Sequence, residues 1–153
     1  SLAVVRRFGV PSAREADLLQ EIFIEVFAKL PRFDANKGSF KTWLRQITVF
    51  RIIDLQRREK RLRFESLDSL QARALASPET LSQLPPAYLL RLIADLPTGY
   101  RTVFNLFAVE GFQHDKIAKL LGISPAGSRS QYHRARKLLQ RALENNLTAT
   151  ADE

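Results

Sequence analysis

Basic side chains gather in two stretches of this sequence, and binding of polyanions is the chemistry that they suit. The chain has 153 residues, with 24 Lys and Arg against 16 Asp and Glu, which gives a formal net charge of +8. Residues 1–63 hold 14 basic and 7 acidic groups (net +7), residues 64–97 hold 2 and 4 (net −2), and residues 98–153 hold 8 and 5 (net +3). Because phosphate contacts dominate affinity for nucleic acids, two basic ends indicate a nucleic-acid binder. Charge alone is equally typical of a solvated surface or of affinity for anionic membrane.

The basic groups near the C-terminal end fall on one predicted helix of a helix-turn-helix. A short helix is predicted over residues 113–121, with Gly122 in the left-handed turn and the small Ala118 at the closest approach of the two helices. Ser124 and Pro125 are typical of the N-cap and the first position of a second helix, which ends near residue 143. Its polar face suits the major groove of DNA and carries Arg129, Ser130, His133, Arg134, Arg136, Lys137 and Arg141. The alternative is an amphipathic hairpin with a solvated basic face.

The N-terminal stretch mixes cations with aromatic rings. This mixture suits single-stranded or melted DNA, because exposed rings stack on unpaired bases while cations follow the backbone. The aromatic members are Phe33, Phe40, Trp43 and Phe50, and the cations are Lys37, Lys41, Arg45, Arg51, Arg57, Arg58, Lys60, Arg61 and Arg63. For any single ring, the alternative is a core stripe of Phe40, Trp43, Leu44 and Ile47.

Two helices are predicted to position these N-terminal groups. The first begins at a capping box formed by Ser12 and Glu15 and ends before Pro31. Its expected packed face consists of Leu19, Ile22, Phe23, Val26, Phe27 and Leu30, and its acidic face of Asp17, Glu21 and Glu25. Ser39 is the expected N-cap of the second helix, which runs over residues 40–63 with a bend or break near residue 50, where its apolar face shifts.

These patterns predict an all-α fold of two small helical domains joined by a flexible linker. We expect the first domain over residues 1–63, the linker over 64–86, the second domain over 87–147 and a frayed tail over 148–153. Helices are also predicted over residues 88–96 and 100–109. No segment shows the strict alternation that is typical of a strand.

The composition excludes several classes of function. The chain contains no Cys, so thiolate metal sites, disulfides and Cys nucleophiles are ruled out. Its two histidines lie 19 positions apart, and no glycine-rich phosphate loop or nucleophile motif occurs, so we expect neither an enzyme nor a cofactor, metal or small-molecule substrate. The sequence lacks an apolar run long enough to cross a bilayer, which indicates a cytoplasmic protein without membrane insertion.

Two sets of motifs, one on each side of the predicted linker, follow each other over about residues 2–144. The first set is Asp17-Leu18-Leu19-Gln20-Glu21-Ile22-Phe23, Gly38-Ser39-Phe40-Lys41-Thr42-Trp43-Leu44 and Ile53-Asp54-Leu55-Gln56-Arg57-Arg58. The second is Leu96-Pro97, Tyr100-Arg101-Thr102-Val103-Phe104, Glu110-Gly111, Ile117-Ala118, Leu121-Gly122-Ile123-Ser124, Ser128-Arg129-Ser130-Gln131 and His133-Arg134-Ala135-Arg136. In order and spacing they resemble the second and fourth conserved regions of the extracytoplasmic-function (ECF, group 4) sigma factors of the sigma-70 family.

This resemblance implies a dissociable initiation subunit of bacterial RNA polymerase that directs promoter recognition, DNA melting and transcription initiation. Its region 2 bundle would bind core polymerase and the minus-10 element, and its region 4 helix-turn-helix would bind the minus-35 element. The resemblance assigns the minus-10 DNA to Phe33, Lys37, Lys41, Trp43, Arg45, Phe50, Arg51, Arg57 and Arg58. It assigns the minus-35 DNA to Ser124, Arg129, Ser130, His133, Arg134, Arg136 and Lys137, and core polymerase to Asp17, Gln20, Glu21 and Glu25. Many members of the family are also held by an anti-sigma factor.

The sequence departs from the family pattern at several positions. A further helix normally precedes the position of Leu2, so we expect an N-terminally trimmed chain. Phe50 stands where many members carry Asn, and Ala126-Gly127 replaces the usual Gly-Thr. Ser128 replaces a branched apolar residue, which predicts looser packing at the start of the recognition helix. The alternative function is a free-standing helix-turn-helix transcriptional regulator that binds duplex DNA without polymerase.

Overall fold

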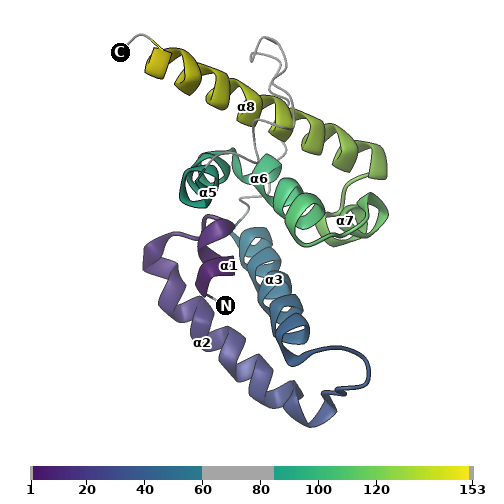
Figure 1. Ribbon diagram of the computed structural model, residues 1–153. Coiled ribbons are helices and arrows are strands. Elements are labelled where there is room, and N and C mark those ends of the chain that lie inside the picture. The colour runs from purple at the N-terminus through teal and green to yellow at the C-terminus, as the bar shows by residue number, and fades with distance from the viewer. Residues whose placement is uncertain (1, 60–84, 152–153) are drawn as a thin grey trace. The chain divides into compact units, whose positions relative to one another are not determined.

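The chain folds into two helical units. The structure, a computed structural model, describes residues 2–59 and 85–151, and the first unit ends at Leu62 while the second begins at Arg63 (Figure 1). Every regular element within those two ranges is a helix, which confirms the predicted all-α class. No helix of the described ranges is both long and apolar enough to span a membrane. Most of the predicted linker, residues 64–84, lies outside the described residues.

In the first unit, two α-helices pack against one long central helix. It comprises α1 (Leu2–Arg7), α2 (Ser12–Lys29), the 3₁₀ turn η1 (Leu30–Arg32) and α3 (Phe40–Arg58). Both α1 and α2 contact α3, which supplies much of the core. The buried apolar side chains of the unit are Val5, Phe8, Val10, Leu18, Ile22, Val26, Ile47, Val49, Ile52 and Ile53.

Helix α3 is uninterrupted from Phe40 to Arg58, so the predicted break near residue 50 is wrong. The apolar face shifts because α3 packs against two helices at once and buries residues on more than one side. Thr48 is fully buried within this helix, where its hydroxyl donates to the carbonyl of Leu44 at 2.9 Å. The predicted cap is confirmed, since the backbone N–H of Thr42 donates to Oγ of Ser39 at 3.2 Å.

The packed face of α2 differs from the predicted one. Leu18, Ile22 and Val26, spaced four residues apart, are buried, whereas Phe23 and Phe27 are 50% and 69% exposed. A stripe with this spacing is narrow, so rings on its flank stay at the surface. The predicted capping box does not form either: Ser12 makes no side-chain cap bond, and the carboxylate of Glu15 pairs with Arg6 at 3.4 Å.

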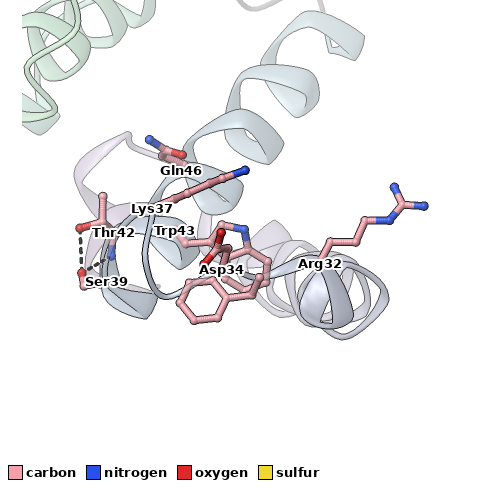
Figure 2. Close-up of a pocket in the computed structure, with 9 residues that line it drawn as sticks. Arg32, Asp34, Lys37, Ser39, Thr42, Trp43 and Gln46 are labelled. Carbon is pink, nitrogen blue, oxygen red and sulfur yellow. Dashed lines mark hydrogen bonds between the residues drawn. The ribbon is translucent and has the colours of Figure 1, made fainter.

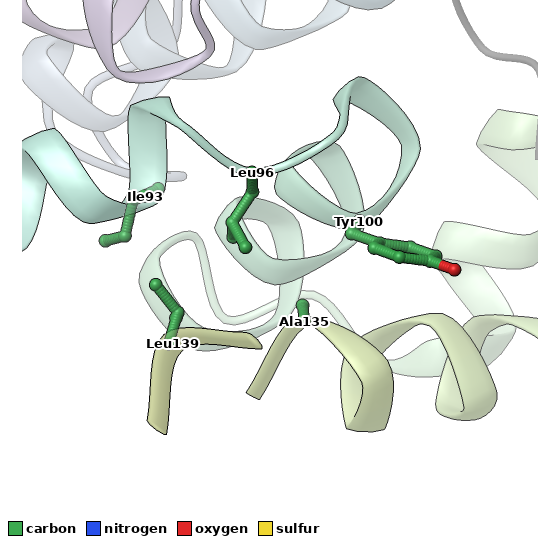
Figure 3. Packing of buried hydrophobic residues seen from close by; sticks show 5 residues of the cluster. All are labelled: Ile93, Leu96, Tyr100, Ala135 and Leu139. Carbon is green, nitrogen blue, oxygen red and sulfur yellow. The ribbon is translucent and has the colours of Figure 1, made fainter. Parts of the chain in front are cut away.

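The second unit places three short helices and one π-helical turn against a long C-terminal helix. Its elements are α5 (Pro86–Ala94), α6 (Thr98–Phe104), η2 (Asn105–Val109), α7 (His114–Leu121) and α8 (Pro125–Ala151). Both α6 and α7 contact α8. One core cluster consists of Ile93, Leu96, Tyr100, Ala135 and Leu139, and Figure 3 shows Ala135 and Leu139 of α8 facing Ile93 and Leu96. Helix α8 extends to Ala151, beyond the predicted end near residue 143 and into the stretch expected to be frayed.

The turn between α7 and α8 has the geometry of a helix-turn-helix. Gly122 adopts the left-handed conformation, with φ 68° and ψ 35°, and Ala118 is 4% exposed between the two helices. The N–H of Ile123 donates to the carbonyl of Ala118 at 3.1 Å. Ser124 caps α8, because its Oγ accepts the N–H of Gly127 at 2.9 Å. The predictions for these positions are confirmed.

Substitution of Gly122 with Ala should destabilise the second unit. No heavy atom lies within 4 Å of the position that a Cβ would take, so the cost is conformational and not steric crowding. We expect the free energy of unfolding to fall by about 1 kcal/mol, measured by urea denaturation with circular dichroism. Gly122→Asn is the matched control, because Asn tolerates the left-handed region and should lose less. Equal losses in the two variants would contradict this account.

Candidate nucleic-acid interface

Three aromatic rings meet where α2 gives way to α3. Phe33, which follows η1, lies 5.6 Å from Phe40 and 5.2 Å from Trp43, measured between ring centroids. The rings of Phe40 and Trp43 are 5.6 Å apart. Phe33 and Trp43 are half-buried and Phe40 is 45% exposed, so the cluster belongs to the surface and not to the core. The alternative of a core stripe therefore fails for Phe40 and Trp43, although Ile47 of that stripe is buried.

A pocket of about 190 Å³ opens beside these rings. Phe33 and Trp43 form its aromatic wall, and its polar lining comes from the loop before α3 and from the first turns of that helix. Figure 2 shows these side chains, which are Arg32, Asp34, Lys37, Ser39, Thr42 and Gln46, with Gly38 completing the lining. An aromatic wall with polar groups at its rim suits a planar base, since the ring offers a stacking surface and the rim offers hydrogen bonds.

Sequence reasoning missed most of the polar lining of this pocket. It singled out Phe33, Lys37 and Trp43, whereas Asp34, Ser39, Thr42 and Gln46 also line it. The loop is shaped by its own hydrogen bonds: the N–H of Asn36 donates to Oδ1 of Asp34 at 2.9 Å. The turn chemistry of residues 32–38 was the available signal, because Asp and Asn at such spacing hold a turn through their side chains.

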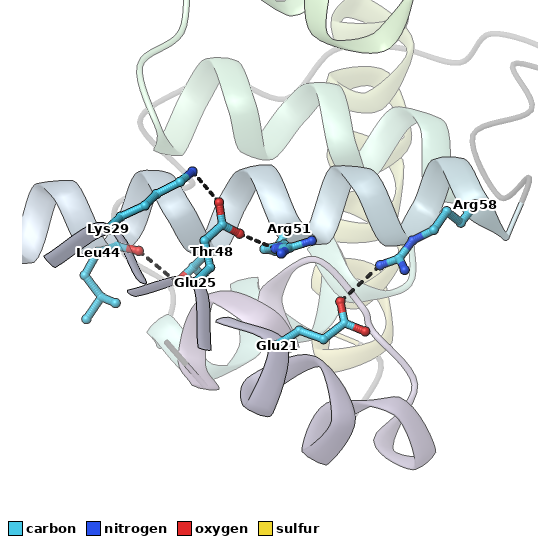
Figure 4. A network of polar contacts seen from close by, with 7 residues as sticks. All are labelled: Glu21, Glu25, Lys29, Leu44, Thr48, Arg51 and Arg58. Carbon is cyan, nitrogen blue, oxygen red and sulfur yellow. Dashed lines mark hydrogen bonds and ion pairs between the residues drawn. The ribbon is translucent and has the colours of Figure 1, made fainter. Parts of the chain in front are cut away.

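The predicted DNA-binding cations of the first unit differ in their exposure and in their pairing with acidic residues. Lys37, Lys41 and Arg57 are exposed. Arg51 and Arg58 instead pair with α2: Arg51 donates to Glu25, and Arg58 donates to Glu21 at 3.1 Å (Figure 4). Arg45 and Phe50 are half-buried.

The four residues predicted to bind polymerase also differ in their surroundings. Asp17 and Gln20 are exposed on α2, whereas Glu21 and Glu25 lie against α3 in the ion pairs with its arginines. Glu25 also accepts a hydrogen bond from Lys29 of its own helix. Burial alone would raise the pKa of Glu25, but hydrogen bonds from Lys29 and Arg51 and the charges of both groups lower it below its ordinary value. Glu25 is therefore a structural tie between α2 and α3.

Helix α8 presents most of its predicted DNA-binding residues at the surface. Arg129, Ser130, His133 and Arg136 are exposed along one side, and Arg134 and Lys137 are half-buried. Ser124 is exposed at the helix start, where its hydroxyl serves as the cap. The opposite side of α8 is held by the core, with Ala135, Leu139 and Leu143 buried.

A second cluster of rings packs at the first turns of α8. Tyr132 lies 5.8 Å from Phe104 and 4.6 Å from Phe107, measured between ring centroids, and Phe107 stacks on His114 at 4.2 Å. Ser128, for which looser packing was predicted, is fully buried and lies 2.8 Å from Nδ1 of His114. The position is thus filled by a hydrogen-bonded side chain.

Comparison with known proteins assigns both units to one family. Residues 2–62 match the sigma-70 region 2 model, and residues 86–139 match the sigma-70 region 4 model. The ECF RNA polymerase sigma factor SigE of Mycolicibacterium smegmatis is 33% identical over 141 residues, which cover 88% of this chain and 54% of that protein. The chain thus spans about half the length of SigE.

Two solved structures have a similar fold. CnrH in complex with the cytosolic domain of CnrY aligns with a TM-score of 0.51 and 25% identity, over 94% of this chain and 80% of that one. The sigma factor RpoE in complex with the anti-sigma factor NepR from Bartonella quintana aligns with a TM-score of 0.57 and 21% identity, over 94% and 89%. The chain belongs to the sigma-70 family of RNA polymerase sigma factors, among its extracytoplasmic-function members.

Replacement of Glu25 with Gln should weaken the tie between α2 and α3. The ionised carboxylate contributes stability that is fully present above its ordinary pKa of 4.5 and is lost as the pH falls through its lowered value in the folded chain. We expect Glu25→Gln to lower the free energy of unfolding by about 1 kcal/mol at neutral pH, because both pairs are partly exposed, and by less in acid.

Urea denaturation at a series of pH values measures both effects. Asp54→Asn, an exposed carboxylate on α3, is the matched control. A loss in Glu25→Gln that does not change between neutral and acid pH would contradict this role for the carboxylate.

Proposed function

We propose that this protein is an RNA polymerase sigma factor that directs promoter recognition, DNA melting and transcription initiation. One observation carries the proposal: a single chain holds an aromatic-walled pocket beside surface cations in one unit and a helix-turn-helix with a basic face in the other. The first suits an unstacked base and the second suits a duplex, which are the two forms of DNA that an initiation factor meets. The proposed place of action is the cytoplasm, and we propose no catalytic role.

The free-standing regulator is not favoured. Such a protein would need only the helix-turn-helix, whereas the region 2 match spans residues 2–62 of this chain. We propose domain limits of 1–63 and 87–147 for the polymerase-binding and duplex-binding parts, with 64–86 as the linker and 148–153 as a tail.

For the minus-10 element, we propose that the pocket takes a base flipped out of the duplex. Phe33 and Trp43 offer ring faces, and Lys37 stands at the rim with its charge available to a phosphate. The remaining proposed contacts of this part are Lys41, Arg45, Phe50, Arg51, Arg57 and Arg58. Arg51 and Arg58 serve DNA only by giving up part of their pairing with α2.

For the minus-35 element, we propose that the first turns of α8 enter the major groove. Arg129 and Arg134 read base edges, since guanidinium groups pair with guanine in two hydrogen bonds. The flanking contacts, to bases or to phosphates, come from Ser124, Ser130, His133, Arg136 and Lys137. The exposure of most of these side chains supports the proposal.

For the partners, we propose core RNA polymerase and an anti-sigma factor. Asp17 and Gln20 are the exposed members of the proposed polymerase contact, with Glu21 and Glu25 beside them. The family resemblance implies the anti-sigma partner, and the sigma factor CnrH, to which this chain is similar, was solved in complex with a protein domain, the cytosolic domain of CnrY.

Run-off transcription tests the proposed function directly. The purified chain is mixed with bacterial core RNA polymerase that lacks sigma, on a pool of random promoter sequences, and the transcribed templates are recovered. Polymerase-dependent initiation, with two enriched sequence elements, is the expected result. If a chain extended at its N-terminus binds core polymerase yet starts no transcript, or if the chain binds duplex DNA specifically without polymerase, the proposal is wrong.

Trp43→Ala should impair opening of the promoter. Loss of one stacking surface for a base costs about 1–3 kcal/mol, so we expect a drop of about 5- to 150-fold in run-off transcription from the enriched promoters. Trp43→Phe, which keeps a ring in the pocket, is the matched control and should retain most of the activity. Equal transcription by Trp43→Ala and the unaltered chain would remove the pocket from the mechanism.

Arg129→Ala and Arg134→Ala should change promoter selectivity. A lost guanidinium pair to a base costs about 1–3 kcal/mol of discrimination, so the preference for the enriched minus-35 sequence should fall at the position that each arginine reads. Competition between promoters with matched and altered minus-35 elements measures it. Lys119→Ala, exposed on α7, is the control for charge alone. Unchanged selectivity in both arginine variants would contradict the assignment.

A further inference from the structure

The imidazole of His114 joins the two helices of the helix-turn-helix. His114 is the first residue of α7, and its Nδ1 lies 2.8 Å from Oγ of Ser128 in the first turn of α8. Its ring stacks on Phe107, with centroids 4.2 Å apart and planes inclined by only 12°. Tyr132, one helical turn after Ser128, lies 6.0 Å from the same ring. Stacking on Phe107 fixes the plane of the imidazole, and the hydrogen bond directs its Nδ1 toward Ser128.

Ser128 depends on this contact because its side chain has no access to water. The residue is 0% exposed. A buried hydroxyl without a hydrogen-bond partner destabilises the fold, because it loses its hydrogen bonds to water and gains none within the protein. His114 supplies the partner. An apolar side chain at this position would fill the same space, but it would not constrain direction, because dispersion contacts are not directional whereas hydrogen bonds weaken steeply with angle.

Arg129 and Ser130 follow Ser128 directly and are exposed. Successive residues of an α-helix are separated by about 100° of rotation, so an anchor at Ser128 determines where the next two side chains leave the helix. A pair of hydrogen bonds between Arg and a base edge tolerates little misdirection. The rotation of α8 relative to α7 therefore matters for any base contact that Arg129 makes.

We propose that His114 and Ser128 are positioning residues for minus-35 recognition: their hydrogen bond sets the rotation of α8 and so aims Arg129 at the base edges. The inference rests on the proposed function, and it deepens that function by naming two residues that act without touching DNA. Neither residue was assigned a role by the resemblance to the family.

The charges around His114 favour the neutral ring. Burial lowers the pKa of His114 below its ordinary value of about 6.5, the charge of Arg129 on α8 lowers it further, and Asp115 on α7 opposes the shift. The rings of Phe107 and Tyr132 also face the imidazole. The contribution of the neutral ring is complete above about pH 6.5 and is lost as the pH falls through the lowered value in the folded chain.

The test compares four variants of the full chain bound to core polymerase. Ser128→Ala removes the hydroxyl without adding volume, and His114→Phe keeps the stacked ring but removes the nitrogen that pairs with Ser128. His114→Asn is the conservative variant, because its side-chain amide can donate or accept a hydrogen bond in place of Nδ1. Lys119→Ala, exposed on α7 and outside the proposed DNA contacts, is the control for selectivity. His133→Asn enters only the pH series on the free protein, as the control for the second histidine. Selectivity is the ratio of run-off transcription from promoters with matched and altered minus-35 elements.

We expect Ser128→Ala and His114→Phe to lower this ratio about fivefold, the loss that corresponds to one hydrogen bond, and His114→Asn to restore much of it. In the free protein, the melting temperature should drop between about pH 7 and pH 5 for the unaltered chain and for His133→Asn, but by less for His114→Asn. Selectivity of Ser128→Ala equal to that of the unaltered chain would overturn the proposal. So would a loss in His114→Phe that His114→Asn does not recover at all.

The design separates this inference from the proposed function. Core binding is measured for every variant by gel filtration with polymerase, and it should not change, because the substitutions lie in the second unit. If the unaltered chain neither binds core polymerase nor starts transcription, the proposed function fails, whatever the variants do. If the unaltered chain transcribes selectively and Ser128→Ala does the same, the positioning role alone fails. Should His114→Phe not fold, Ser128→Ala decides the outcome.

Discussion

Each unit of this protein depends on burying part of the surface of a single long helix while leaving the rest of that helix exposed. In the first unit, α3 buries Ile47, Val49, Ile52 and Ile53 against α1 and α2. In the second, α8 buries Ala135, Leu139 and Leu143. The side chains of a helix point in fixed directions around its axis, so packing of the apolar ones in the core determines which of the others face the solvent. The proposed DNA contacts are thus placed by the apolar residues between them.

The ends of these helices lie at the two candidate DNA surfaces. The first turn of α3 holds Phe40 and Trp43 beside the pocket, and the first turns of α8 hold Ser128, Arg129 and Tyr132. Both helix starts are capped by a serine, Ser39 for α3 and Ser124 for α8. A capped start satisfies backbone donors that would otherwise be unpaired, which keeps the first turn ordered where the side chains must be presented accurately.

The polar contacts between α2 and α3 join residues that we assign to two different partners. Glu21 and Glu25 belong to the proposed polymerase contact, while Arg51 and Arg58 belong to the proposed minus-10 contact, and in the free chain they pair with one another. The pair of Arg58 with Glu21 is the more exposed, so it contributes less to the free energy of unfolding, and a binding partner can replace it more easily. The pair of Arg51 with Glu25 is more buried and acts mainly to hold the unit together.

The amino-acid sequence alone determined the class of the fold, the helix-turn-helix and the family. Apolar periodicity located α2, α3 and α7, and Gly122 and Ser124 marked the turn, because left-handed backbone and helix caps are local properties that particular residue types satisfy. The sequence also indicated which residues carry positive charge. These features depend on neighbours along the chain, so no tertiary contact is needed to infer them.

Only the tertiary structure decided which rings pack and which cations stay free. Phe23 and Phe27 fit a helical stripe, yet they are exposed, and α3 is uninterrupted although its apolar face shifts. Arg51, which pairs with Glu25, and His114, which pairs with Ser128, lie on other helices, 26 and 14 residues away along the chain. Periodicity identifies a helix but not the number of helices that pack on it, and residue type does not reveal a partner distant in sequence. Packing between helices settles both.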